Sequence, residues 1–494
     1  MPAPRILLSA EWVLGHRDGR HCLVREGEVV VEGQRIVFAG NRFPGEVAER
    51  REYGAALIAP GFIDLDALSD LDTTILGYDN HPAWRKGRVW PRSYVGRGPY
   101  EMYSPEELAF QKRYAFGQLL RHGITTALPI GSLFYREWGE TVEEFADAAE
   151  AAADLGLRVY LGPAYRTGNL VVEDDERITT SFDEARGLRG LDEAIEFCRA
   201  QEGRHGGLIR TMLAPDRIET CTPTLLRRTA DAVRELDVPV RLHCCQSKLE
   251  YELVLAQHGM SPPEWLRALG FLSPRALLPQ GTWVSGSRGI ERPGRDLEII
   301  RDAGATLVHC PLVSARGGRA LDSVARCRRL GLRVGMGTDT APPDMLLNMQ
   351  LGAMLCRIME GDATSVRAED LFDAATVHGA DALGRPDLGR LQPGAMADLV
   401  VWDMGRDRPR SPLDPIQSLM TEGTSQDVTD VMVDGRFRVR DRRLVGAGGE
   451  PDHARAARQF EGLVRLYPDR TWKHPPRGEI FSSSYPVIDT DAAQ

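Results

Sequence analysis

The sequence contains no uninterrupted apolar run of about 18 residues, the length that a membrane-spanning helix needs. Its 8 cysteines include no CxxC pair, which argues against a zinc ribbon or a redox dithiol. It has no stripe of basic residues, and its net charge of -10 argues against a general nucleic-acid binder. No segment with a charged start, an apolar middle and small residues opens the chain. We therefore expect a cytoplasmic protein that binds neither membranes nor nucleic acid.

What is present is the composition of an ordinary folded protein, with 42% hydrophobic and 27% charged residues. A chain of 494 residues is too long for one small core and suits a large barrel with a second unit. The strand-like runs of the middle region are 57–63, 124–129, 157–161, 208–213, 238–243, 281–284, 305–309 and 333–337. The helical runs between them include 105–121, 141–155, 222–236, 296–303 and 321–330. This alternation predicts an α/β fold, a (β/α)8 TIM-like barrel over residues 60–384.

The two ends of the chain have a different pattern, with short alternating runs separated by turn residues. Residues 1–59 read as a small β-meander, and residues 385–445 have the same texture. Within the second segment, Asp434-Gly435 separates two strand-like runs and predicts a hairpin. We expect these two segments to form one composite β-sandwich domain. Residues 446–494 are expected to form a C-terminal helix, from an amphipathic run at 452–466, and a tail.

Catalytic groups of such barrels lie at the carboxyl ends of the parallel strands. In this sequence those positions hold Asp66, His243, His309 and Asp339. His243 and Asp339 suit acid–base chemistry, because an imidazole can exchange a proton while a carboxylate fixes its tautomer. Cys244-Cys245 reads either as two small buried hydrophobes or as a reactive thiol. Neighbours on a strand point in opposite directions, so at most one of these thiols should face the centre.

Five short segments follow one another in a characteristic order. They are Ala59–Asp64 (APGFID), His122–Thr126 (HGITT), His309–Pro311 (HCP), Gly335–Asp339 (GMGTD) and Gly389–Leu399 (GRLQPGAMADL). In this order they resemble the amidohydrolase superfamily, in its branch of triazine chlorohydrolases and nucleobase-type deaminases. The resemblance extends to about residue 445. It implies the barrel, a small β-domain, a small-molecule substrate, and a homodimer or higher homo-oligomer.

The resemblance also implies a metal site that this sequence carries only in part. Members of the branch bind one divalent ion, usually zinc or iron, whose bound hydroxide attacks a carbon bearing an amine or a chloride. His243 matches the ligand of the fifth strand and Asp339 that of the eighth. Asp66 and Leu68 stand where the first strand usually has two histidines. No lysine occurs in 208–213, so a carboxylated-lysine two-metal centre is not available.

Two further positions of the family pattern are changed. Gln246 stands in place of the glutamate that moves a proton, and Gln280 aligns with the ligand histidine of the sixth strand. An amide does not titrate, so Gln246 cannot act as that acid or base. We therefore expect no cofactor, with a divalent metal as a weak possibility. The ligands of such an ion would be His243, Asp339 and Asp66.

The residues then predict an enzyme with His243, Asp339 and Asp66 as catalytic groups and no tightly held metal. It would act on a small planar nitrogen-containing molecule, by carbon–nitrogen bond hydrolysis or by a lyase or cyclisation step. Two alternatives remain open. The chain could be a catalytically inactive homologue that serves as a partner subunit or a small-molecule binder. It could also be a metallohydrolase with an unusual ligand set.

A long aromatic and basic segment, 69–103, follows the first strand of the barrel. Trp84 and Trp90 could stack on a planar ring there, although aromatic and arginine residues are also typical of a subunit contact. Arg166 follows the third strand and could pair with an anionic group. The candidate substrate-binding residues are Gln246, Gln280, Trp84, Trp90, His309 and Arg166.

Overall fold

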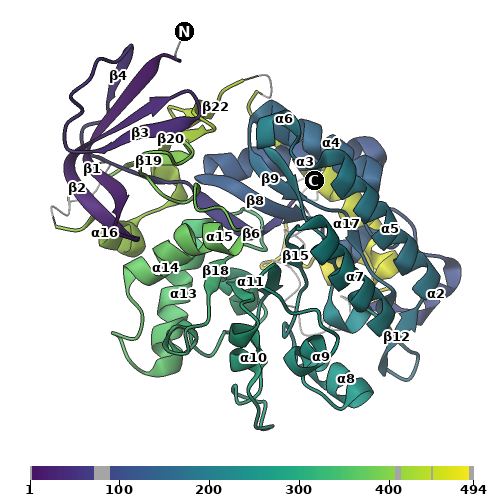
Figure 1. Cartoon of the computed structure of the whole chain (residues 1–494). Helices are drawn as coiled ribbons and strands as arrows, with labels where there is room; N and C mark the ends of the chain where they lie inside the picture. The colour runs from purple at the N-terminus through teal and green to yellow at the C-terminus, as the bar shows by residue number, and fades with distance from the viewer. Residues whose placement is uncertain (1–2, 72–88, 406–412, 447–448, 489–494) are drawn as a thin grey trace.

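The computed structural model describes residues 3–71, 89–405, 413–446 and 449–488. Over these ranges the protein is an α/β structure in which strands from both ends of the chain lie together at one end of the molecule (Figure 1). Most of the remaining described chain forms parallel strands with helices packed around them, together with a small sheet that contains one antiparallel pair. Within the same ranges, no helix combines the length and the apolar character needed to cross a membrane.

The first and last parts of the described chain share one nine-stranded sheet, in the order β22-β21-β20-β19-β5-β1-β2-β3 with β4 paired to β1. Its strands are β1 (Arg5–Arg17), β2 (Arg20–Glu32), β3 (Arg35–Gly40), β4 (Glu49–Glu52), β5 (Ala56–Pro60), β19 (Leu399–Asp403), β20 (Val428–Val433), β21 (Arg436–Arg440) and β22 (Arg443–Leu444). The two parts meet where β19 pairs antiparallel with β5, with Val401 opposite Ile58. Both side chains are fully buried in an apolar cluster. The sheet is composite, as the sequence predicts; its arrangement as a sandwich and its domain limits stay predictions.

The middle of the described chain contains two four-stranded parallel sheets, β6-β8-β9-β13 and β15-β16-β17-β18. The strands are β6 (Phe62–Leu68), β8 (Ile124–Ile130), β9 (Arg158–Leu161), β13 (Ile209–Thr211), β15 (Val240–Arg241), β16 (Ala276–Pro279), β17 (Thr306–His309) and β18 (Val334–Met336). A parallel bridge between Leu213 and Val240 connects the first sheet to the second. On the opposite edges, the Asp339 backbone N–H donates to the Asp66 carbonyl at 2.8 Å. The residues that follow the strands are therefore brought towards one another.

Helices connect these strands and cover them. They include α3 (Pro105–Arg121), α4 (Val142–Leu155), α5 (Glu184–Gln201), α7 (Pro223–Leu236), α8 (Lys248–His258), α9 (Pro262–Ala268), α10 (Asp296–Asp302), α11 (Pro311–Arg316), α12 (Val324–Arg329), α13 (Met345–Glu360), α14 (Ala368–Ala374), α15 (Val377–Ala382) and α16 (Pro415–Glu422). Shorter elements are β7 (Trp90–Pro91), α2 (Arg92–Arg97), β10 (Ala164–Tyr165), β11 (Gly168–Val172), β12 (Ile178–Phe182) and β14 (Ala214–Pro215).

The start of α3 is fixed by a capping box in which Ser104 and Glu107 accept each other's backbone N–H.

The structure corrects two strand predictions. The run 57–63 is not one strand: β5 ends at Pro60 in the composite sheet, and β6 begins at Phe62 in the parallel sheet. Gly61 lies between them, where an added Cβ would be 2.1 Å from Oγ1 of Thr125, so only glycine allows this close approach. The sixth strand is Ala276–Pro279 rather than 281–284, because the backbone turns away at Gln280, whose φ is 83°.

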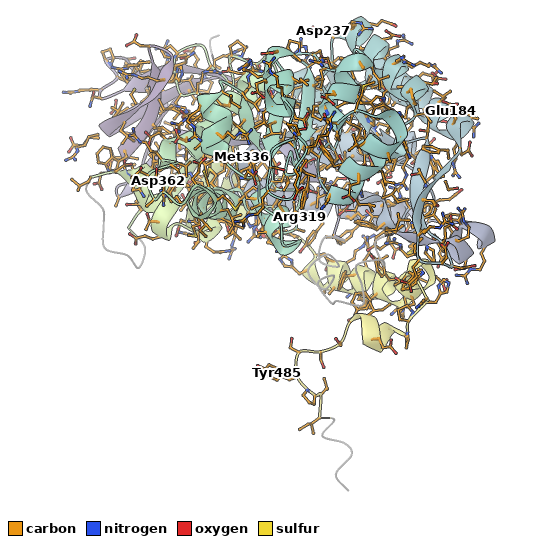
Figure 2. The ribbon with its side chains drawn as sticks, turned by 90° about the horizontal axis from the view of Figure 1, so that it is seen from below. Glu184, Asp237, Arg319, Met336, Asp362 and Tyr485 are labelled. Atoms are coloured by element: carbon orange, nitrogen blue, oxygen red, sulfur yellow. The ribbon has the colours of Figure 1, made fainter. Side chains whose placement is uncertain are left out.

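The C-terminal region contains the expected amphipathic helix, α17 (His453–Leu466), which packs near α3. Hydrogen bonds join the two, from Gln459 Nε2 to the Glu107 carbonyl at 3.1 Å and between Tyr114 and His453 at 2.8 Å. After the short α18 (Arg477–Ile480), the described chain extends away from the body, and Tyr485 on this segment is 81% exposed (Figure 2). α17 therefore ties the end of the chain to the helical layer around the first parallel sheet.

Candidate active site

Asp66, His243 and Asp339 come together although they are far apart in the sequence. Asp66 lies in β6, His243 follows β15, and Asp339 follows β18. One ligand-type atom from each lies within 4.8 Å of the others. Asp66 and His243 are buried, with 1% and 6% exposure, and Asp339 is partly exposed. The carboxyl ends of the parallel strands thus bring one imidazole together with two carboxylates, which is a suitable arrangement for proton transfer.

Both ring nitrogens of His243 face an acceptor. Nδ1 lies 3.2 Å from the backbone carbonyl oxygen of Asp216, and Nε2 lies 3.4 Å from Oδ2 of Asp66. A neutral imidazole has one donor, whereas an imidazolium has two, so this geometry favours the charged form. Burial opposes that charge, but the attraction and hydrogen bond of Asp66 outweigh it and raise the pKa of His243 to about 9. His243 is therefore a proton donor near neutral pH.

Asp66 is held between two cationic side chains. Its Oδ1 lies 3.2 Å from Nη1 of Arg241, while its Oδ2 faces His243 and accepts from the Cys310 thiol at 3.5 Å. Burial alone would raise the pKa of Asp66, but attraction to His243 and then to Arg241 holds it below the ordinary range. Asp66 is therefore a permanent carboxylate that orients His243 and balances its charge.

The pKa of Asp339 is shifted in the opposite direction from that of Asp66. Burial, followed by repulsion from Asp66, raises its pKa to about 7. Its Oδ2 accepts a 2.8 Å hydrogen bond from the side-chain nitrogen of Gln280. Ser314 fixes the orientation of that amide, because its hydroxyl donates to Oε1 of Gln280 at 2.8 Å. Asp339 can thus exchange a proton near neutral pH, beside a histidine that is already protonated.

A cavity of about 270 Å³ opens onto His243 and Asp339. Its wall includes Leu68, Trp90, Arg166, Asn169, Asp216, Arg217, Gln246, Arg319 and Val313. Three of the predicted substrate-binding residues, Trp90, Arg166 and Gln246, line this cavity. Gln280 is not in the described wall, but its side chain donates a hydrogen bond to Asp339, which is. His309 is not part of the described wall: its Nε2 lies next to Gly352 of α13, and burial lowers its pKa to about 4. Trp84 lies outside the described residues.

Arg166 is the most deeply buried arginine of the described cavity wall, with 6% exposure. Its Nη1 donates to Oδ2 of Asp216 at 3.1 Å, and its guanidinium lies 5.5 Å from the ring centre of Trp90. Nε and Nη2 have no hydrogen-bond partner among the described residues. These two nitrogens therefore carry buried hydrogen-bond donors next to the cavity.

Two neighbours of the site, Arg241 and Asp216, were not predicted from the sequence. Arg241 precedes His243 by two positions, and alternation along a strand places both on the same face, so this spacing was a usable signal. Asp216 acts on His243 through its backbone carbonyl, which no side-chain pattern reveals.

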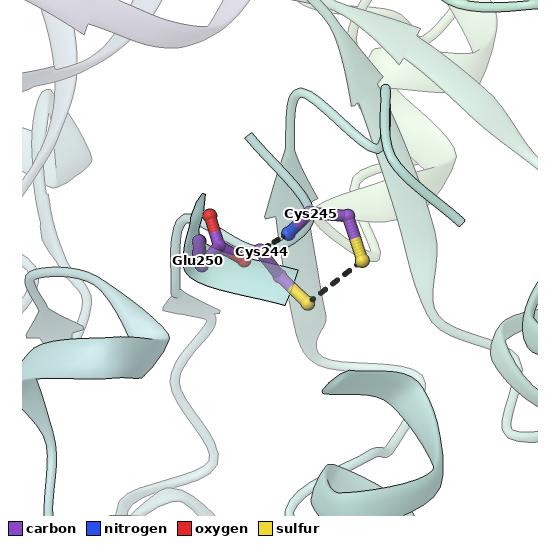
Figure 3. A group of neighbouring side chains, drawn as sticks. All are labelled: Cys244, Cys245 and Glu250. Carbon is purple, nitrogen blue, oxygen red and sulfur yellow. Dashed lines mark hydrogen bonds between the residues drawn. The ribbon is translucent and has the colours of Figure 1, made fainter. Parts of the chain in front are cut away.

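The two cysteines after His243 do not follow the strand alternation expected of them. Cys245 has a φ of 61°, so the chain leaves extended geometry and the two sulfurs lie 3.7 Å apart (Figure 3). The prediction that they point in opposite directions is therefore wrong. Glu250 accepts the backbone N–H groups of Cys245 and Gln246, the second at 2.8 Å. Burial raises the pKa of Cys245 well above the ordinary value, which favours the unreactive thiol.

The family model described as the amidohydrolase family matches residues 57–438. The chain belongs to the amidohydrolase family. This confirms the resemblance carried by the five sequence segments.

Relatives of this amidohydrolase are known from sequence and from structure. It is 25% identical over 430 residues to the 5-methylthioadenosine/S-adenosylhomocysteine deaminase of Natronomonas pharaonis, covering 85% of this chain and 90% of that protein. A zinc complex of atrazine chlorohydrolase from Arthrobacter aurescens TC1 has a TM-score of 0.75 at 22% identity, covering 93% of this chain and 99% of that one. An adenosine deaminase from Xanthomonas campestris with bound zinc has a TM-score of 0.72 at 21% identity, covering 94% and 99%. The structural likenesses show a shared fold.

Zinc in those two structures raises the question of whether the donors of this amidohydrolase fit a metal. Each candidate ligand already has a partner: Asp66 faces Arg241 and His243, and Asp339 accepts from Gln280. Leu68 carries no ligand atom, whereas zinc in proteins prefers several His or Cys donors. A divalent ion would also meet the positive charge of Arg241 next to Asp66. Among the described residues, Asp66, His243 and Asp339 could still offer one ligand atom each to an ion.

Proposed function

We propose that this amidohydrolase hydrolyses a carbon–nitrogen bond in a small planar nitrogen-containing molecule, by acid–base chemistry and without a tightly held metal. The substrate class is supported by its relatives, whose names specify deaminases of adenosine derivatives and a chlorohydrolase of a triazine. The cavity has the features that such a molecule needs, with an aromatic side chain and several hydrogen-bonding groups in its wall.

The single observation that carries the proposal is the pair formed by His243 and Asp339. His243 has acceptors at both ring nitrogens and a pKa near 9, while Asp339 has a pKa near 7. Two groups whose pKa values are separated in this way can serve as acid and base at the same pH.

In the proposed reaction, Asp339 accepts a proton from water as the water oxygen bonds to the carbon. His243 donates its proton to the departing amine, and the carbon–nitrogen bond breaks to release ammonia and leave a hydroxyl on the carbon. The hydroxyl product converts to its carbonyl tautomer when its proton moves to a ring nitrogen, and transfer of the proton from Asp339 to His243 restores both groups. Asp66 stays ionised and holds His243 in place. A lyase or cyclisation step would use the same two proton transfers.

Substrate binding is assigned to the cavity wall. Trp90 can stack against a planar ring, Gln246 can donate and accept hydrogen bonds, and Arg166 has two donor nitrogens, Nε and Nη2, without a partner among the described residues. We also propose that the eight parallel strands close into one barrel, supported by the Leu213–Val240 bridge and the Asp339–Asp66 hydrogen bond. A homodimer is part of the proposal and can be checked by light scattering.

The experiment combines metal analysis with an ammonia-release assay. Protein purified without added metal or chelator is analysed by inductively coupled plasma mass spectrometry and then assayed with adenosine derivatives, aminotriazines and guanine. We expect less than about 0.1 equivalents of zinc, iron or manganese per chain, and ammonia release that survives a chelator. One equivalent of metal with activity lost to the chelator would overturn the metal-free mechanism. Ligand binding without turnover of any class would indicate a small-molecule binder instead.

A further inference from the structure

Arg241 is a cation buried beneath the proposed catalytic groups. It lies at the end of β15 with 1% exposure, two positions before His243, and both side chains contact Asp66. Its Nη1 lies 3.2 Å from Oδ1 of Asp66 and donates to the backbone carbonyl of Leu128. Arg241 is not in the described cavity wall, so it acts on the site through Asp66.

The surroundings of Asp66 leave little place for a metal ion, because both carboxylate oxygens already face a cationic side chain. One carboxylate oxygen faces Arg241, and the other faces His243. The guanidinium of arginine carries a positive charge in proteins, so Arg241 places a cation directly against this carboxylate. Neighbouring Asp64 does not provide a free carboxylate, because it accepts from the Thr338 backbone at 3.0 Å and the Thr338 hydroxyl at 2.5 Å.

We propose that Arg241 is a built-in cation that supplies a positive charge beside Asp66, in addition to that of His243, and excludes divalent metal from the Asp66–His243–Asp339 cluster. Arg241 is a positioning residue, because it holds Asp66 and reaches the reacting atoms only through it. The inference rests on the proposed metal-free chemistry, but it concerns metal affinity and is tested without a substrate. Its corollary is that removing the charge of Arg241 turns the cluster into a metal site.

The test measures zinc binding by isothermal titration calorimetry and metal content after dialysis, on full-length protein freed of metal with a chelator. We compare the natural protein with Arg241→Met, which removes the charge, and Arg241→Lys, which keeps it. Arg166→Met is the matched control, because it removes another buried arginine of the site that is paired with Asp216 rather than Asp66. We expect about one zinc per chain in Arg241→Met, and less than about 0.1 in the other three proteins.

The zinc bound by Arg241→Met should disappear when Asp339→Asn is added, which locates it in the cluster. A folded Arg241→Met protein that binds no zinc would overturn the proposal, as would stoichiometric zinc in the natural protein that is lost with Asp339→Asn. Near-ultraviolet circular dichroism verifies the fold of each variant.

A second variant keeps the proposal testable if Arg241→Met does not fold. Leu68→His adds a ligand at the cavity end of β6 while Arg241 remains. We expect this variant to stay below about 0.1 zinc per chain, because the guanidinium still occupies its place beside Asp66. Stoichiometric zinc in Leu68→His would overturn the exclusion by Arg241. Neither result depends on whether a substrate has been found, so the proposed reaction can fail while this inference stands.

Discussion

The Gln280 side chain donates a 2.8 Å hydrogen bond to Asp339 across 59 positions of sequence. Both residues have a left-handed backbone, with φ of 83° and 42°. Each such conformation costs a non-glycine residue roughly 1–3 kcal/mol and persists only where the surrounding structure fixes it. The hydrogen bond therefore joins two strained positions that follow β16 and β18, two strands separated by β17, and it controls the environment of one carboxylate.

Replacing Gln280 with leucine should shift the pH dependence of the enzyme. The amide stabilises the ionised form of Asp339, whose pKa is already raised to about 7. Without the donor, that pKa should rise further, and the acid limb of the kcat/KM profile should move to higher pH. Ser314→Ala, which only frees the amide to rotate, should give a smaller shift. An acid limb that does not move in Gln280→Leu would exclude Asp339 as the titrating base.

The natural enzyme should be most active between about pH 7 and pH 9. Asp339 acts as a base only above its pKa of about 7, and His243 acts as an acid only below its pKa of about 9. The product of the two fractions gives a bell with its plateau between these values. The kcat/KM of ammonia release, measured in constant-ionic-strength buffers from pH 5 to 10, checks this. A rate that keeps rising above pH 9 would contradict the role of His243 as the acid.

Replacing His243 with glutamine should lower kcat by roughly 100- to 10,000-fold, the usual contribution of a positioned acid or base. Glutamine retains hydrogen bonding but cannot exchange a proton, so substrate binding, measured by calorimetry, should change much less. Thr364→Ala changes an exposed turn, and it serves as a control for the effects of mutagenesis and purification on turnover. Unchanged turnover in His243→Gln would favour a protein whose histidine is structural.

The sequence predicts the longer elements well because their signals are local. The helix predicted over 105–121 has an amphipathic pattern and the capping residues Ser104 and Glu107. In the structure, α3 begins and ends at the same two residues as the prediction. The sixth strand was misplaced because β16 is a short apolar run that ends in proline. A run of this length is too short to show the alternation of apolar and polar residues that identifies a strand. The division of 57–63 depends on the packing of Gly61 against Thr125, which is a tertiary contact.

The candidate site was predictable to the extent that it repeats family motifs. Asp66, His243 and Asp339 were selected from such motifs, and the structure brings them within 4.8 Å. The state of each group was not predictable, because the pKa values depend on burial and on Arg241, a neighbour from another strand. The placement of His309 next to α13 likewise follows from packing between elements that no single motif describes.

Cys244 and Cys245 should resist thiol reagents in the native protein. Both are buried with 1% exposure, and the pKa of each thiol is raised, so little thiolate forms and access is limited. Cys22 is partly exposed and serves as the internal reference. Alkylation with iodoacetamide followed by peptide mass spectrometry should label Cys22 long before the vicinal pair. Rapid labelling of either Cys244 or Cys245 would restore the hypothesis of a reactive thiol beside His243.

The link between the composite sheet and the parallel sheet should depend strongly on one buried ion pair. Arg158 of β9 donates to both oxygens of Asp398, at 2.9 and 3.2 Å, and both side chains are at most 3% exposed. Removing one partner of such a pair leaves a buried uncompensated charge, so Arg158→Met should lower the free energy of unfolding by about 3–5 kcal/mol. Urea denaturation followed by circular dichroism measures this.

The reason for that loss can be tested with a second substitution. Asp398→Asn added to Arg158→Met removes the orphaned charge while its side-chain oxygen can still accept the backbone N–H of Asp434, which now donates at 2.7 Å. The double variant should therefore be more stable than Arg158→Met alone. Arg177→Met, which breaks the exposed pair with Asp175, should leave the urea midpoint unchanged. Equal losses in the single and double variants would show that lost packing, rather than an unpaired carboxylate, destabilises the link.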